Sequence, residues 1–350
     1  MVVNNAIFYK NRIALMTKKY CISGYYGFDN FGDETILKIL VENLKKFDSD
    51  ITVFSSNPIK TSEKLNVNSV KSFDLKGVVK SLKQADCLIS GGGSLLQDVT
   101  SKKSLIYYLG VIFLAQLFKK KIIIFAQGIG PINDKFLQKV AKFLLKKADY
   151  ISVRDEKSLG LLNSWGINAD LCSDPVWNID LPVVEKSEKV GVQLRSFPLL
   201  NDEFLLNLAQ NINKNYADKE ILVLSLQNKL DMEVCNKFND ILKEINPNIK
   251  SNVVENTSND EVINVISSLN TLIAMRYHAC LIAIKSQVKL LPINYDIKVE
   301  NIANMFELNS LSLNDFEKNN KTFEEFYSTE LVYDEEKIKA QKLNFEKIII

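Results

Sequence analysis

The single histidine of the chain, His278, stands where it could transfer a proton. Two residues, Arg276 and Tyr277, separate it from the apolar run at residues 271–275, and it opens an expected helix. A histidine with an ordinary pKa near ~6.5 can donate or accept a proton at neutral pH. A lone histidine is more often structural than catalytic. The hypothesis that His278 is a general acid therefore depends on its neighbours and its position.

Cationic side chains follow the ends of several other apolar runs. Arg195, Arg276 and Lys298 each lie just beyond one, and we expect them to surround a single anion. Arg154 follows the run at residues 150–153, where a surface ion pair is the alternative to anion binding. Together with His278, these residues suit a small phosphorylated acid. Asp155, next to Arg154, is read more simply as a helix N-cap.

A glycine-rich loop at residues 23–34 leaves the first expected strand and opens a helix. Gly27 would let the backbone approach a ligand closely, and Asn30 is a candidate substrate ligand. Asp33 has two interpretations that the sequence leaves open. It is either the N-cap of the following helix or a general base that meets substrate hydroxyls.

Two further loops also come directly after apolar strands. Their candidate substrate-binding residues are Gly91, Gly92, Gly93, Ser94, Gln97 and Gln127. Three successive glycines cost conformational entropy, so we expect them where a side chain would block a ligand. The alternatives are a tight strand–helix turn for the glycines and a structural role for Gln127.

These loops must be positioned by alternating strands and helices. The strands are continuous apolar runs, which is typical of parallel sheets covered on both faces. A charged segment at residues 185–189 interrupts the alternation, which then restarts. We predict an α/β protein of two doubly wound, Rossmann-like domains facing across a cleft. They would comprise residues 16–180 and 188–310, followed by a helical tail, 311–350, that crosses back to the first domain.

Composition excludes several classes of protein. The 350 residues include 44 basic and 42 acidic side chains, which argues against nucleic-acid binding. Five widely spaced cysteines without a CxxC pair indicate neither a disulfide framework nor a metal site, and fit a reducing cytoplasm. No apolar run has the length of a transmembrane helix. Residues 1–15 precede a plausible start at Met16, and we expect them to be disordered or untranslated.

The loops together resemble the polysaccharide pyruvyltransferases, most closely the CsaB type. The matching stretches follow the family's order and are residues 22–34, 91–98, 126–131, 152–156, 174–175, 276–278 and 295–299. The family typically has leucine where Tyr277 stands. The resemblance implies a glycosyltransferase-B-like fold, phosphoenolpyruvate as co-substrate and no cofactor or metal.

The resemblance also implies an activity: transfer of pyruvate as a ketal onto a sugar of a cell-wall or exopolysaccharide precursor, typically the 4,6-hydroxyls of N-acetylmannosamine. The family's donor-site arginine, histidine and lysine correspond to Arg154, His278 and Lys298, whereas Arg195 and Arg276 are added on chemical grounds. The resemblance thus implies that the domain of residues 16–180 is the acceptor side and the domain of residues 188–310 is the donor side. His278 would protonate C3 of the donor or bind its phosphate. A lipid-linked acceptor would bring this cytoplasmic protein to the inner face of a membrane. The alternatives are a nucleotide-sugar glycosyltransferase of the same fold and a non-enzymatic sugar-binding module.

Overall fold

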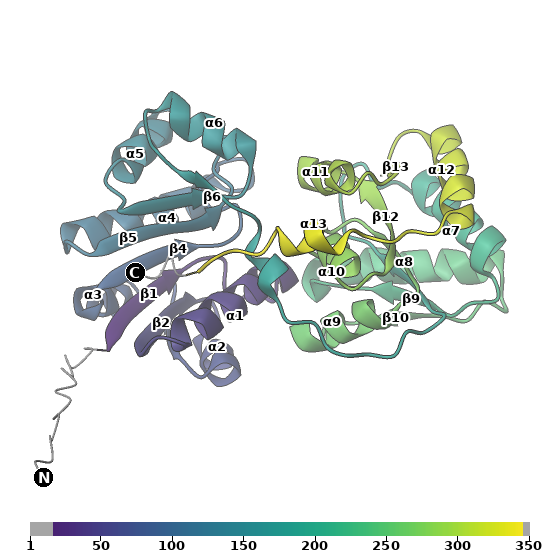
Figure 1. Cartoon of the computed structure of the whole chain (residues 1–350), viewed down its shortest axis with the longest axis horizontal. Helices are drawn as coiled ribbons and strands as arrows, with labels where there is room; N and C mark the ends of the chain where they lie inside the picture. The colour runs from purple at the N-terminus through teal and green to yellow at the C-terminus, as the bar shows by residue number, and fades with distance from the viewer. Residues whose placement is uncertain (1–16, 346–350) are drawn as a thin grey trace, which may run out of the picture.

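Two parallel sheets organise the computed structural model, which describes residues 17–345 (Figure 1). Each sheet carries helices on both faces, so the prediction of two doubly wound α/β domains is confirmed. The leader predicted at residues 1–15, and the start of the first domain at Met16, lie outside the described residues.

The first domain contains a seven-stranded sheet with the order β3-β2-β1-β4-β5-β6-β7. Its strands are β1 (Lys18–Ser23), β2 (Ser49–Ser55), β3 (Asn68–Lys71), β4 (Cys87–Gly91), β5 (Lys121–Gln127), β6 (Tyr150–Val153) and β7 (Asp170–Leu171). Its helices are α1 (Phe31–Lys45), α2 (Pro58–Leu65), α3 (Leu75–Gln84), α4 (Lys102–Leu117), α5 (Lys135–Leu145), α6 (Glu156–Ser164) and the short 3₁₀ helix η1 (Pro175–Asn178).

Successive residues of these strands enter different cores. Ile22 and Ile89 pack with α1, whereas Cys21 and Leu88 pack with α3, α4 and α5 on the other face. Strands buried on both faces need apolar side chains at every position, which explains the continuous apolar runs.

The second domain contains a six-stranded sheet with the order β10-β9-β8-β11-β12-β13. Its strands are β8 (Val190–Gln193), β9 (Ile221–Leu224), β10 (Ser251–Val254), β11 (Thr271–Ala274), β12 (Lys289–Asn294) and β13 (Leu311–Ser312). Its helices are α7 (Asp202–Tyr216), α8 (Asn228–Ile245), α9 (Asn259–Ser268), α10 (Tyr277–Lys285), α11 (Ile297–Met305) and α12 (Phe316–Ser328). Among residues 17–345, no helix combines the length and the apolar character needed to cross a membrane.

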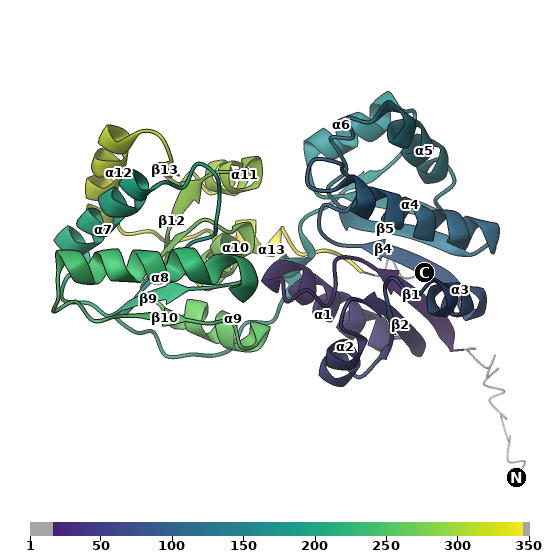
Figure 2. The same ribbon diagram turned by 180° about the vertical axis from the view of Figure 1, so that it is seen from behind.

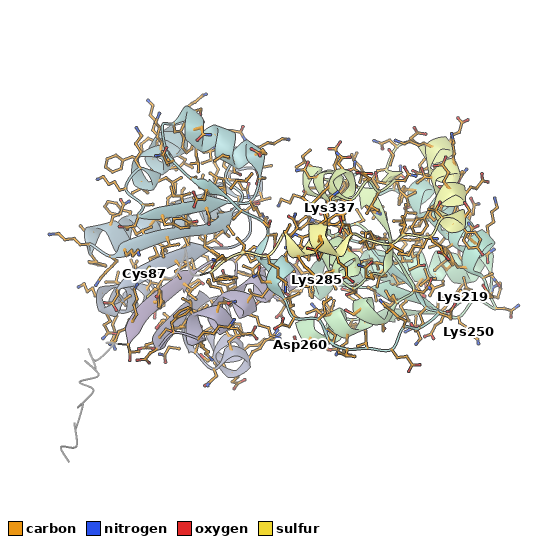
Figure 3. The ribbon with its side chains drawn as sticks, viewed as in Figure 1. Cys87, Lys219, Lys250, Asp260, Lys285 and Lys337 are labelled. Carbon is orange, nitrogen blue, oxygen red and sulfur yellow. The ribbon has the colours of Figure 1, made fainter. Side chains whose placement is uncertain are left out.

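The two domains pack against each other through α1 and η1 of the first and α9 and α10 of the second. One apolar cluster extends across this boundary and includes Phe31 and Trp177. Polar contacts join the same elements: Asp260 pairs with Lys38 at 2.6 Å, and Lys285 donates to the carbonyl oxygen of Trp177 at 2.6 Å. Figure 3 labels Asp260 and Lys285 where the domains meet. The boundary is thus a packed interface.

The C-terminal segment returns to the first domain. Residues 311–328, where the tail was predicted to begin, form β13 and α12 and lie within the second domain. The following stretch includes α13 (Glu335–Lys339) and runs back across the boundary, in yellow in Figure 1. There Phe345 packs against Phe125 of β5, with ring centroids 5.6 Å apart. This segment connects the domains a second time.

Candidate active site

The carboxyl ends of both sheets carry the loops that the sequence singles out. In each sheet the strand order reverses at one point, between β1 and β4 in the first domain and between β8 and β11 in the second. Ligands of doubly wound sheets bind in the crevice beyond such a reversal. The loops after β1, β4 and β11 therefore define where a substrate would enter.

A buried ion pair stands at the centre of the site. Arg154, just after β6, donates through Nη1 to Oδ2 of Asp174, the N-cap of η1, and the two side chains are 7% and 1% exposed. Burial works to raise the pKa of Asp174, but His278 and Arg154 outweigh it and hold the pKa well below the usual range. Asp174 is therefore ionised at any pH at which the protein would function.

Two cations, one from each domain, converge on Ser94. Arg154 Nη2 lies 3.3 Å from Ser94 Oγ, and Lys298 Nζ of the second domain lies 3.1 Å from the same oxygen. Burial lowers the pKa of Lys298, and the neighbouring charge of Arg154 lowers it further. Two cations held around one hydroxyl form a site suited to an anion.

His278 approaches this pair from the second domain. Its Nε2 lies 3.4 Å from Oδ2 of Asp174, and this buried nitrogen forms no hydrogen bond within residues 17–345. The two atoms are close enough for an ion pair when the ring carries its second proton, so the Asp174 carboxylate orients His278. The ring also packs against Gly32 of α1, where a β-carbon would overlap it. Gly32 thus allows the two domains to bring His278 next to Asp174.

We predict that Gly32→Ala lowers turnover at least about tenfold, because the added methyl group displaces the His278 ring. Alanine favours a helix over glycine by about 1 kcal/mol, so an effect on helix stability alone would act in the opposite direction. Gly160→Ala in α6 is the matched control, since a β-carbon there meets no atom within 4 Å. Steady-state kinetics of the two variants make the comparison. Equal activity would show that His278 need not occupy the observed position.

Asp33 lies in the first turn of α1, near the charged groups of His278, Arg154 and Lys298. Its alternative role as the N-cap is wrong, because Asn30 caps α1 by accepting from the backbone N–H groups of Gly32 and Asp33. Burial raises the pKa of Asp33, although His278, Arg154 and Lys298 oppose the shift. A carboxylate with a raised pKa is a better base near neutral pH. The structure thus places Asp33 where it could act on a bound hydroxyl.

Glu34 supports the loop that leads to Asp33. Because Glu34 is itself partly buried, its ionisation should affect the stability of the fold. Its Oε1 accepts from the Gly27 N–H at 2.7 Å, while burial raises the pKa of Glu34 to about 7. A raised pKa in the folded state stabilises the fold below the unfolded pKa, and this contribution is lost as the pH rises through about 7. Above that pH the folded protein holds a buried charge.

We therefore predict that Glu34→Gln, which keeps the oxygen that Gly27 needs, increases the free energy of unfolding by about 1–2 kcal/mol at pH 8 and by much less at pH 5. Denaturant titrations at the two pH values measure the difference. Glu244→Gln, at an exposed position on α8, is the control. An equal effect of Glu34→Gln at both pH values would contradict the prediction.

The glycines of the predicted binding loops accommodate the protein's own side chains. A β-carbon on Gly92 would lie 2.5 Å from Ile36, and one on Gly93 would lie 2.6 Å from Oδ1 of Asp33. Both glycines have positive φ, at +70° and +72°, which other residues rarely adopt. Their absent side chains thus allow α1 to pack against β4. Gly91 accepts a hydrogen bond from Tyr26 Oη, and a β-carbon on Gly27 would overlap Ser55.

The predicted glutamine ligands are engaged locally. Gln97 accepts from the backbone N–H groups of Val99 and Thr100 and thereby closes its own turn. Gln127 is fully buried and donates to Ser90 Oγ at 2.9 Å. Asn30 donates to Gln227 of the second domain at 3.4 Å in addition to capping α1. Among the four uncharged polar residues predicted to bind substrate, Asn30, Ser94, Gln97 and Gln127, it is Ser94 that contacts Arg154 and Lys298.

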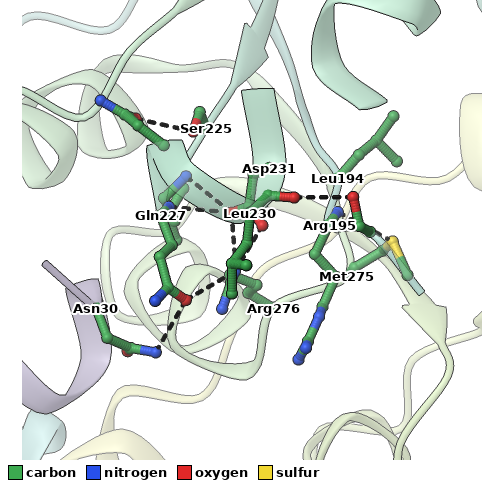
Figure 4. Close-up of polar contacts among 12 residues, drawn as sticks. Asn30, Leu194, Arg195, Ser225, Gln227, Leu230, Asp231, Met275 and Arg276 are labelled. Carbon is green, nitrogen blue, oxygen red and sulfur yellow. Dashed lines mark hydrogen bonds and ion pairs between the residues drawn. The ribbon is translucent and has the colours of Figure 1, made fainter. Parts of the chain in front are cut away.

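Arg195 and Arg276 form a second arrangement, at the reversal point of the second sheet (Figure 4). Arg276 makes a two-pronged ion pair with the fully buried Asp231, at 2.6 and 2.9 Å. Arg195 donates to Tyr295 Oη at 3.1 Å and lies over the ring of that tyrosine. Each arginine thus has a partner within the second domain, to which Lys298 also belongs, and the grouping of Arg195, Arg276 and Lys298 around one anion stays a prediction.

Asp174 and Asp231 are two carboxylates of these ion pairs that were not predicted as site residues. Asp174 belongs to a matching stretch, but its partners Arg154 and His278 lie 20 and 104 positions away in the chain. Asp231 is one of several acidic residues in the α8 sequence. No local pattern marks a carboxylate that will pair with a distant cation. The one usable signal was the position of Asp174 directly before Pro175 at the start of a turn.

Comparison with known families decides what this site belongs to. A family model described as polysaccharide pyruvyl transferase matches residues 30–297. The chain belongs to this family. The matched range includes Asp33, Ser94, Arg154, Asp174 and His278, and it ends immediately before Lys298. No curated protein sequence matches the chain significantly.

Solved structures similar to this pyruvyl transferase family member establish its fold. The UDP-GlcNAc 2-epimerase of Methanocaldococcus jannaschii has a TM-score of 0.62 at 11% identity, covering 91% of this chain and 95% of the epimerase. Anabaena Alr3699/HepE, in complex with UDP and glucose, has a TM-score of 0.60 at 10% identity and coverages of 95% and 97%. A glycosyltransferase from Rickettsia africae has a TM-score of 0.60 at 12% identity, covering 89% of each chain. At such identities the likeness shows a glycosyltransferase-B-like fold and does not extend to the reaction.

Proposed function

We propose that the protein transfers pyruvate from phosphoenolpyruvate, as a ketal, onto two hydroxyls of a sugar in a cell-wall or exopolysaccharide precursor. One observation carries the proposal: Arg154 and Lys298, from different domains, converge on Ser94 beside the pair formed by His278 and Asp174. Phosphoenolpyruvate carries both a carboxylate and a phosphate, so it needs at least two cations. It also needs an acid that protonates its enol carbon, C3. The proposed reaction uses phosphoenolpyruvate as a co-substrate and needs neither a cofactor nor a metal ion.

The proposed steps follow from these groups. His278 donates a proton to C3, which becomes a methyl carbon and leaves C2 electrophilic. A sugar hydroxyl attacks C2, and Asp33 accepts its proton. The bond from C2 to the phosphate oxygen then breaks, and Arg154 and Lys298 stabilise the charge that develops on the phosphate. The second hydroxyl closes the ketal ring. The two hydroxyl protons balance the one given to C3 and the one taken by phosphate.

We place the acceptor sugar against the first domain, because Asp33 and the loop before α1 belong to it. The acceptor we propose is a hexose such as N-acetylmannosamine, with its 4- and 6-hydroxyls ketalised and a lipid carrier attached. The reaction would then take place in the cytoplasm, at the inner face of the membrane that holds the carrier.

The deciding experiment incubates the protein with phosphoenolpyruvate and a panel of nitrophenyl and lipid-linked hexoses. We expect phosphate release that requires both substrates, together with a product heavier than the acceptor by one ketal-linked pyruvate in the mass spectrum. Phosphate release without such a product, or no release with any acceptor in the panel, would contradict the proposal.

A nucleotide-sugar glycosyltransferase is the second candidate. It is favoured by Arg195 and Arg276 at the reversal point of the second sheet, where doubly wound folds bind ligands. The structure of HepE, which has the same fold, contains UDP and glucose, but at 10% identity that likeness concerns the fold alone. Isothermal titration separates the candidates. Binding of phosphoenolpyruvate without binding of uridine diphosphate sugars supports pyruvyl transfer, and the reverse result supports glycosyl transfer.

A further inference from the structure

Two neighbouring helices of the first domain present apolar side chains to solvent. Along α4, Ile106, Phe113 and Leu117 are exposed and follow one another at helical spacing, so they share one stripe. On α5, Phe136 and Phe143 form a second stripe and are 71% and 56% exposed. The two helices contact each other on the same face of the sheet, and Figure 2 shows this side of the domain. We refer to these five side chains as the α4–α5 face.

Lysines surround this face. Residues 102–149 contain ten lysines and two aspartates, although the whole chain has only two more basic than acidic side chains. The rest of the chain is therefore net acidic. Of the lysines on α4 and α5, only Lys102 pairs with a carboxylate within the described range 17–345, at 3.2 Å from Asp134. Just beyond α5, Lys147 lies 4.1 Å from the ring centre of Phe143, so charge and apolar surface alternate.

The face adjoins the candidate active site. In a parallel sheet, each crossover helix begins at the edge where the preceding strand ends. α4 follows the loop that contains Ser94, and α5 follows the loop after β5. Lys103 and Phe136, in the first turns of these helices, therefore lie toward the sheet edge that carries the site.

We propose that the α4–α5 face docks the protein onto an anionic lipid bilayer. Exposed aromatic and aliphatic side chains flanked by lysines are the combination that binds such a surface, because the apolar groups enter the headgroup boundary while the lysines attract anionic lipids. A protein partner with an apolar patch would not need four further lysines on α4 and α5 that pair with no carboxylate within residues 17–345, namely Lys103, Lys135, Lys139 and Lys142. Docked in this way, the protein would hold the entrance of its site next to the membrane. The proposal concerns lipid binding alone and does not depend on the reaction proposed above.

Sedimentation of the full-length protein with lipid vesicles, without any substrate, tests the proposal. We expect at least about tenfold stronger binding to vesicles of phosphatidylcholine with about 30% phosphatidylglycerol than to phosphatidylcholine alone, weakening as salt is added. The triple variant Lys103→Glu, Lys135→Glu, Lys139→Glu should lower the partition coefficient about a hundredfold. The double variant Phe136→Ser, Phe143→Ser should lower it at least about tenfold.

Each variant has a matched control. The control for the lysine variant changes the net charge by the same amount but lies in the second domain, where Figure 3 labels Lys250; it is the triple variant Lys229→Glu, Lys243→Glu, Lys250→Glu. Phe47→Ser, Ile59→Ser removes exposed apolar groups elsewhere on the first domain. Both controls should bind vesicles within about twofold of the natural protein. Equal losses in variants and controls would overturn the proposal. A second outcome would also overturn it: the natural protein does not bind vesicles, and sedimentation velocity shows a dimer that the double variant Phe136→Ser, Phe143→Ser dissociates.

Discussion

Replacing His278 with glutamine is expected to lower kcat by about 10²–10⁴-fold with little change in the affinity for phosphoenolpyruvate. Glutamine occupies a similar volume and can donate a hydrogen bond, but it cannot deliver a proton to C3. Arg154 and Lys298 remain in place to bind the donor, because their contacts with Asp174 and Ser94 do not involve the histidine. The loss should therefore appear in turnover and not in binding.

Steady-state kinetics and titration with phosphoenolpyruvate together test this prediction. They also separate the two roles that the sequence leaves open for His278. A large rise in KM and Kd with little change in kcat would show that His278 mainly binds phosphate. Thermal unfolding provides the control for folding, since the His278 ring packs against Gly32 at the domain boundary. Unchanged turnover would remove His278 from the mechanism altogether.

The sheets were predictable because their strands are short, continuous apolar runs. The runs at residues 150–153 and 271–275 correspond to β6 and β11, and the cationic residues that follow them lie at the sheet edge as expected. The edge strands β3 and β13 were not predicted. β3 is half-exposed and contains asparagine, serine and lysine, and β13 has only two residues. Strands that pair on one side alone carry little of the apolar pattern.

The site was predictable where a residue's role follows from its place next to a strand. Arg154 and Lys298 come together as the fold requires, once the two sheets face each other. Asn30, in contrast, supplies the cap that Asp33 was a candidate for, and choosing between them requires knowing where α1 begins. The ion pair of Arg276 with Asp231 joins residues 45 positions apart, so the sequence could not show that this arginine already has a partner.

Replacing Asp174 with asparagine is expected to reduce both activity and stability. The carboxylate faces the buried Arg154 and lies 3.4 Å from His278, and it accepts from the Val176 N–H at 3.0 Å. Asparagine can keep the last of these bonds but leaves the Arg154 charge buried without its counter-ion. Removing one partner of a buried ion pair costs about 3–5 kcal/mol. We also expect kcat to fall by about 10²-fold, because the orientation and charge balance of His278 depend on this carboxylate.

The pH dependence distinguishes this loss from a general weakening of the fold. The neighbouring His278 and Arg154 hold the pKa of Asp174 below its usual range, despite burial, so its stabilisation is present above the unfolded pKa of about 4 and is lost as the pH falls through the folded value. The difference in unfolding free energy between the natural protein and Asp174→Asn should thus be full at pH 7 and shrink below about pH 4. Asp202→Asn, which breaks the exposed pair with Lys237, is the control and should change stability by at most about 1 kcal/mol. If Asp174→Asn changed stability no more than this control while abolishing turnover, Asp174 would act on the substrate directly instead of positioning Arg154 and His278.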